Sequence, residues 1–278
     1  MIRQHRVRAI LFGCVIALAS ASGIAAQQAK DILDTAMEKY EARMKSIENY
    51  TVVQGMMGMS VSTYFERREI DGHSVFVPSG SGMGDKQSAA DADAYRNMSR
   101  MAEKATYEGK RKVGDRNAHV IRVTDPQSMG WDGRMAAGDD VNFQPKDLTL
   151  FISDDDYVML RFEFSGNATV KGQVKPVTSA INFEDYRNVE GLLHPFRTTL
   201  EMEGMMDASM SPEDKANAEQ SLAEMEKQLA AMPESQRKMM EDMLGDQLKQ
   251  LRGMLEPGGG KMTIEVTEVR VNTGRSGE

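Results

Sequence analysis

The sequence is short of cysteine and tryptophan, with one of each in 278 residues. Cys14 lies inside an apolar run near the N-terminus, where we interpret it as an ordinary hydrophobic residue. The rest of the chain therefore has no thiol for a disulfide, a zinc site or a nucleophile, and its stability must come from core burial. After that run no stretch approaches the roughly 18 apolar residues of a membrane-spanning helix, so we expect the remainder to be soluble.

Catalytic motifs are also missing. The chain has no His-Glu-x-x-His and no Gly-x-Ser-x-Gly, and its histidines have no metal-ligand spacing. The glycines at 80, 82 and 84 do not continue into the Lys-Ser/Thr of a phosphate-binding loop. Asp154–Asp156 offers carboxylates to a hard cation, but a tight turn between two strands selects the same residues. We therefore expect no enzymatic activity, no metal and no cofactor.

Basic residues are in the minority. Lys and Arg number 34 against 42 Asp and Glu, which gives a formal net charge of −8. Such a surface argues against nucleic acid and against anionic membranes as partners, because both attract basic proteins.

The N-terminus has the three parts of a secretory signal peptide in order. Three arginines within the first eight residues precede an apolar run over 9–19, and small residues follow up to Ala25-Ala26. We predict that residues 1–26 form a signal peptide and that a single domain, 27–278, works in the periplasm after cleavage.

The pattern downstream predicts a helix followed by an antiparallel meander. Apolar residues at spacings of three and four predict an amphipathic helix over 28–47. A mobile loop is expected over 79–94, a short helix over 91–104 and an irregular stretch over 125–146. Alternation and turn signals predict strands at 50–67, 73–77, 107–113, 118–123, 148–153, 157–166, 168–186, 192–203 and 261–271.

Each main strand places its apolar residues on one side. In 50–67, Val53 shares its parity with Met57, Met59, Val61 and Phe65. In 157–166 the apolar parity is that of Val158, Leu160, Phe162 and Phe164. A sheet of such strands has one apolar face, which something must cover.

Two helices are predicted between the last two strands. Ser211 and Pro212 form a helix start, and Pro233 opens a second helix that ends before Pro257. The segment 205–258 is therefore predicted to be an αα-hairpin inserted into the meander, positioned to cover the sheet or to dock a partner.

Methionine is abundant, with 23 residues against 9 phenylalanines. The groups Met56-Met57 with Met59, Met205-Met206, and Met239-Met240 with Met243 contain the soft thioether ligands that Cu(I) prefers. Most of these residues also fall at helix or strand spacing, where methionine fills cores and adaptable apolar surfaces.

Three segments carry a family resemblance: AKDILDTAMEKYEARMKSIENYTV, LTLFISDDDYVMLRFEF and EDYRNVEGLLHPFRTTLEM. Their order resembles that of the outer-membrane lipoprotein-sorting (LolA-like) carriers, over most of 28–203 plus the last strand. The resemblance implies an α+β fold that is mainly antiparallel β, a curved incomplete barrel covered by helices, whose cavity binds acyl chains. The compact carriers do not contain the predicted hairpin at 205–258.

These observations predict a periplasmic, non-enzymatic binder of a hydrophobic ligand, either a lipid or the acyl chains of a lipoprotein. The alternatives are an envelope module that docks a protein partner through the helical hairpin, and a methionine-rich copper binder. The candidate ligand-binding residues are Met57, Met59, Val61, Phe65, Leu160, Phe162, Phe164, Phe196, Leu200 and Met202. For each of them ordinary core packing is an equal alternative.

Overall fold

The computed structural model describes residues 4–56, 59–70, 73–79, 101–126, 142–170, 173–203, 212–255 and 260–275, with side chains from Gly23 onward. Its helices and strands are α1 (Gln4–Met44), β1 (Asn49–Met56), β2 (Met59–Ile70), β3 (His73–Ser79), β4 (Ala105–Val113), β5 (Arg116–Thr124), β6 (Asn142–Ser153), β7 (Met159–Val170), β8 (Gln173–Val189), β9 (Leu192–Glu203), α5 (Pro212–Ala231), α6 (Glu234–Leu255) and β10 (Gly260–Val271).

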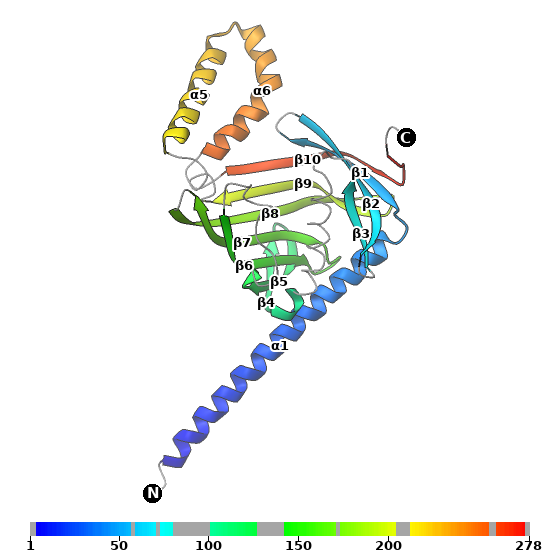
Figure 1. The fold of residues 1–278 in the computed structure, drawn as a ribbon, viewed down its shortest axis with the longest axis vertical. Coiled ribbons are helices and arrows are strands. Elements are labelled where there is room, and N and C mark those ends of the chain that lie inside the picture. Colours follow the sequence, from blue (N-terminus) through cyan, green and yellow to red (C-terminus); the bar gives the residue numbers. More distant parts are fainter. Residues whose placement is uncertain are drawn as a thin grey trace.

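The strands form a single antiparallel sheet of ten strands in the order β3-β2-β1-β10-β9-β8-β7-β6-β5-β4. The sheet is open, with β3 and β4 as its edges (Figure 1). Chain order is kept from β4 to β10, and β1 joins the far side of β10. The turn between β8 and β9 consists of Glu190 and Gly191, both at positive φ (51° and 95°). Two-residue hairpin turns favour such φ values because they match the right-handed twist of the flanking strands. The predicted mainly antiparallel fold is confirmed.

One face of the sheet packs against α1, and we call it the α1 face. Ala29 and Leu33 of α1 are buried in one cluster with Ile121, Leu148 and Leu150 of the sheet. The N-terminal part of α1 extends away from the sheet (Figure 1), and Ala29 is the first fully buried residue among the described side chains. The helix therefore starts to contribute to the core just after the predicted cleavage position.

The C-terminal end of α1 covers a second cluster on the same face. Met44 and Ile47 are buried there with Leu192, Phe196 and Val269. Two clusters under one helix mean that α1 crosses much of the sheet, as Figure 1 shows.

The predicted single strand over 50–67 is wrong. Met56 pairs with Met59, and Gln54 pairs with Val61, so β1 and β2 form a hairpin. As a consequence Val61 shares a face with Gln54 rather than with Val53.

The parity predicted for the strand 157–166 is also wrong at Leu160. Phe151 pairs with Arg161 and Ile152 with Met159, so Leu160 is an extra residue in a β-bulge. Phe162 packs with the α1-face cluster, whereas Leu160 lies in a cluster with Val120 and Phe151 on the opposite face. One inserted residue therefore reverses which side the neighbouring apolar positions occupy.

Several predicted boundaries also shift. The strand β7 continues to Val170, so residues 168–170 do not belong to the next strand, and β6 begins at Asn142 within the stretch predicted as irregular. The predicted loop over 79–94 lies outside the described residues from residue 80 on, and of the helix over 91–104 only 101–104 are described, as helix.

Two helices separate β9 from β10 in the sequence. Helices α5 and α6 pack against each other, and α6 also contacts β10. They extend beyond the sheet on the side away from the N-terminal end of α1 (Figure 1).

A candidate apolar groove

An apolar groove of about 420 Å³ lies between α1 and the sheet. This volume falls within the range of about 300–1,000 Å³ that is usual for small-molecule sites. The helix contributes side chains that recur every three or four residues along one side, namely Leu33, Ala36, Met37, Tyr40, Arg43 and Met44.

The opposite wall comes from strand ends and turns that are far apart in the sequence. It includes the turn after β6, the C-terminal end of β8 and the start of β9. These residues are Tyr50, Ile152, Tyr157, Val158, Met159, Phe183, Tyr186, Leu192, Leu193, His194 and Pro195. Most of this wall is aliphatic or aromatic, so the groove suits a hydrophobic ligand.

The polar groups in the groove are neutral at pH 7 apart from Arg43. Burial lowers the pKa of His194 to about 4, so its imidazole is uncharged. Burial raises the pKa of both Tyr40 and Tyr186, so both phenols keep their protons. The Tyr186 hydroxyl donates to the Met159 carbonyl oxygen at 2.6 Å, which ties β8 to β7 at the base of the groove.

None of the residues predicted from strand alternation whose side chains are described lines this groove, although several lie beside residues that do. Phe162 and Phe164 belong to the core under α1. Phe196 is buried beside His194, with ring centroids 6.4 Å apart. Phe65 stacks on Tyr50 at 4.7 Å.

The other predicted residues are more distant or lie outside the described part. Leu160 lies on the opposite face, and Val61 and Leu200 are half-buried in β2 and β9. Met57 and the side chains of Met59 and Met202 lie outside the described residues. Contact between these ten residues and a ligand stays a prediction.

The alternation method missed the groove because it considered strands only. Six of the seventeen lining residues come from α1, whose predicted span contained Leu33, Tyr40 and Met44 as one apolar side. The sequence signal was therefore present in the helix. Alternation assigned Tyr157 and Val158 to the strand 157–166, but β7 begins at Met159, so both residues lie in the turn before it.

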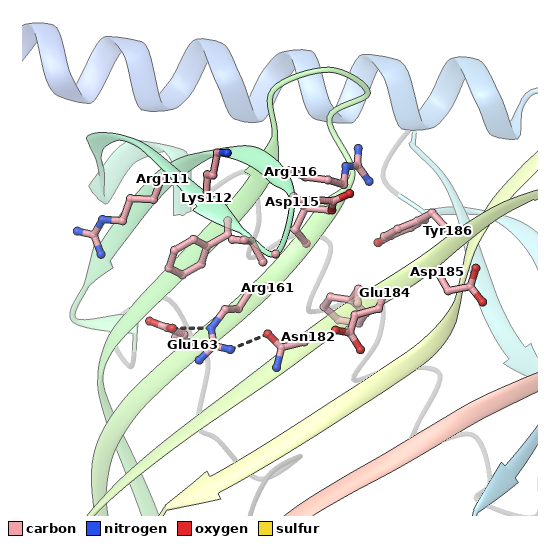
Figure 2. A pocket seen from close by; sticks show the side chains of 15 residues that line it. Arg111, Lys112, Asp115, Arg116, Arg161, Glu163, Asn182, Glu184, Asp185 and Tyr186 are labelled. Carbon is pink, nitrogen blue, oxygen red and sulfur yellow. Dashed lines mark hydrogen bonds and ion pairs between the residues drawn. The ribbon is translucent and has the colours of Figure 1, made fainter.

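A second pocket, of about 700 Å³, lies between the tip of the β4–β5 hairpin and strands β7 and β8 (Figure 2). Its central cation, Arg161, is engaged within the protein. Arg161 donates from Nε to Glu163 at 2.6 Å and from Nη1 to Asn182 at 2.6 Å, and it pairs with Glu201 at 3.2 Å. Because its central cation is neutralised within the protein, this pocket is less suited to a ligand than the groove.

The acidic turn Asp154–Asp156 makes ion pairs with the neighbouring hairpin. Lys110 Nζ lies 2.6 Å from Asp154 Oδ2, and Arg116 Nη2 lies 2.6 Å from Asp156 Oδ1. The hydrogen bond from Lys110 lowers the pKa of Asp154. Within the described part of the chain no three His, Cys, Asp or Glu side chains are grouped to hold a metal ion.

The copper alternative depends largely on residues that are not described. Residues 57, 205 and 206 and the side chain of residue 243 lie outside the described part, and Met239 is exposed.

No helix within the described residues is long and apolar enough to cross a membrane.

The fold is similar to that of several solved structures. A DUF1329 family protein from Desulfovibrio piger is 11% identical, with 91% of this chain and 95% of that chain covered at a TM-score of 0.39. A putative outer membrane lipoprotein-sorting protein domain from Vibrio parahaemolyticus is 10% identical, with 88% and 95% covered at 0.36. A LolA superfamily protein from Nitrosomonas europaea is 9% identical, with 85% and 92% covered at 0.28.

The resemblance to lipoprotein-sorting proteins noted in the sequence thus recurs in the structural comparison. At these TM-scores the likeness carries no argument about function, so the function is argued from the groove itself. No protein-family model matches the chain, and no curated protein matches it either.

Proposed function

We propose that this chain is an exported, non-enzymatic carrier that binds a hydrophobic ligand, a lipid or the acyl chain of a lipoprotein, in the groove between α1 and the sheet. The observation that carries the proposal is the groove itself, an apolar cavity of about 420 Å³. Burial of an apolar chain against such a lining removes apolar surface from water, which is favourable. The signal-peptide pattern supports export to the periplasm.

The position of α1 gives this carrier a simple way to admit a ligand. The helix forms one wall, and its contact with the sheet rests on side-chain packing at Ala29, Leu33 and Met44. A small displacement of one helix widens the groove without breaking any strand pairing. We propose that α1 covers the groove. The resemblance to lipoprotein-sorting carriers implied this role for helices.

The proposal is tested by filling the groove. Ala36 lines it from α1, and a tryptophan there would occupy part of its volume. We expect Ala36→Trp to abolish saturable binding of an apolar fluorescent probe, while Glu38→Trp, at an exposed position of the same helix, binds it normally. Thermal unfolding checks that both variants fold, and Met37→Trp repeats the test at a second lining residue. Unchanged probe binding in the folded groove variants would overturn the proposal.

A second candidate function is docking of an envelope protein by α5 and α6. It is favoured by the exposed Met225 and Met239 on helices that extend beyond the sheet (Figure 1). Native mass spectrometry of the protein purified from its own periplasm distinguishes a bound lipid from a bound protein.

A further inference from the structure

Two cations of α1, Lys39 and Arg43, lie one helical turn apart beside the groove. Arg43 lines it, and its Nη1 donates to the carbonyl oxygen of Asp156 at 2.8 Å. Lys39 donates from Nζ to the carbonyl oxygen of Asp155 at 3.3 Å and lies 4.2 Å from the ring centroid of Tyr157. The turn between β6 and β7 therefore holds both cations at the edge of an apolar cavity.

Neither cation is paired with a carboxylate within the part of the chain that the structure describes. Two of the three acids in the adjacent turn are engaged elsewhere, since Asp154 pairs with Lys110 and Asp156 pairs with Arg116. In the second pocket, by contrast, Arg161 is neutralised by two glutamates. Arg43, the cation that lines the groove, therefore differs from Arg161 in having no carboxylate partner among the described residues.

Both side chains keep donors for a ligand. A guanidinium has five N–H donors and an ammonium has three, and the two hydrogen bonds to the turn use one donor of each. The phenol of Tyr40, which keeps its proton because burial raises its pKa, lines the groove three residues before Arg43. An acidic group placed here would accept charge-assisted hydrogen bonds, which are about twice as strong as neutral ones.

We propose that the groove binds a single-chain anionic amphiphile, with its carboxylate or phosphate at Arg43 and Lys39 and its alkyl chain on the apolar lining. This inference rests on the proposed function and names its ligand class. A cavity near 150 Å³ holds one benzene molecule, so about 420 Å³ suits one alkyl chain rather than several. The acidic surface, with a net charge of −8, attracts no anion by itself, so recognition depends on these local contacts.

The test compares ligands of equal chain length that differ in headgroup. Dodecanoate, dodecyl phosphate, dodecanol and dodecyltrimethylammonium are each titrated by displacement of an apolar fluorescent probe. We expect at least one of the two anions to bind about tenfold or more tightly than dodecanol, since a hydrogen bond to a charged group contributes about 1.5–3 kcal/mol. The alkylammonium should bind more weakly than the alcohol. The tighter of the two anions identifies the preferred headgroup.

Variants then assign the effect to the two cations. Arg43→Gln should weaken anion binding about tenfold and leave dodecanol binding unchanged, and Lys39→Gln should do the same to a smaller extent. Lys30→Gln, on the same helix but paired with Asp34, is the matched control and should have no effect. Lys39→Gln carries the test at the second cation should Arg43→Gln fail to fold.

The outcomes separate the two proposals. Equal affinity for the anions and dodecanol, or equal weakening of both by Arg43→Gln, would overturn this inference and leave the hydrophobic carrier in place. Absence of binding for all four compounds would overturn the carrier proposal as well.

Discussion

The guanidinium of Arg67 in β2 donates from Nε to the carbonyl oxygen of Ile47 at 2.8 Å, just beyond the end of α1. Its Nη2 also donates to the carbonyl oxygens of Met44 and Ile47. The last carbonyls of a helix have no donor within the helix, and a cation there also interacts favourably with the helix dipole. Arg67 therefore fixes the end of α1 over the sheet, and with it one end of the groove.

This relationship predicts a large effect of a single substitution. Arg67→Ala should lower the free energy of unfolding by about 2–3 kcal/mol, because it leaves carbonyl groups that are partly buried without their charged donor. Urea unfolding measures the change. Arg68→Ala is the control, since the neighbouring arginine is exposed and pairs only locally with Glu66; exposed pairs of this kind contribute less than about 1 kcal/mol. Similar effects of the two substitutions would contradict the assigned role.

The bulge at Leu160 predicts that two adjacent residues respond differently. Leu160→Ala should destabilise the fold by about 2–5 kcal/mol, as for other buried leucines, and leave the affinity for an apolar probe unchanged. Met159→Ala should weaken probe binding, because Met159 lines the groove. Urea unfolding and probe titration give both quantities. Loss of probe affinity in a folded Leu160→Ala variant would show that Leu160 acts in ligand binding.

The neutral His194 predicts a pH dependence of stability. Its pKa is about 4 in the folded chain against an ordinary value of 6.5, so the unfolded state binds more protons between those values. The stability that the neutral imidazole contributes is therefore fully present above pH 6.5 and is lost as the pH falls towards 4. The loss is at most about 3.5 kcal/mol, since one pKa unit corresponds to about 1.4 kcal/mol.

Comparison with His194→Gln isolates this contribution from the titration of carboxylates. The difference in unfolding free energy between the native chain and the variant should change across pH 4–6.5 in favour of the variant at low pH. A constant difference over that range would show that His194 titrates normally.

The export prediction concerns the N-terminus. The exported form should begin within a residue or two of Gln27, so its intact mass should be lower by the mass of about 26 residues. Removal of this segment leaves Ala29 and Leu33 in place, and these are the first α1 residues buried in the core. An exported form that retains Cys14, or that carries a diacyl group, would contradict the prediction.

The helices α5 and α6 are predicted to be dispensable for the sheet and for the groove. Met202 of β9 pairs with Gly260 of β10, so a Gly-Asn-Gly turn in place of residues 206–259 can join two strands that are already adjacent. We expect cooperative unfolding and unchanged probe affinity, because the groove is covered by α1. Loss of cooperative unfolding would show that these helices complete the core. Loss of a co-purifying protein would support the docking alternative.

The sequence alone determined the elements that depend on local periodicity and turn chemistry. The strands at 107–113, 118–123, 192–203 and 261–271 are confirmed to within two residues, because alternation and turn residues act over a few positions. The two helices after residue 211 are present for the same reason, since a capping serine, a proline and an apolar stripe are local signals.

Only the tertiary structure decided which faces meet. The pairing of Met56 with Met59 and the extra residue at Leu160 each reverse the side on which later residues point, and neither interrupts the apolar pattern in the sequence. The groove joins α1 to strand ends more than a hundred residues away. Its charge depends on the pairing of Asp154 with Lys110 and of Asp156 with Arg116. Periodicity shows which side of a helix or strand is apolar and which is polar. A binding site depends on which of these sides the folded chain brings together.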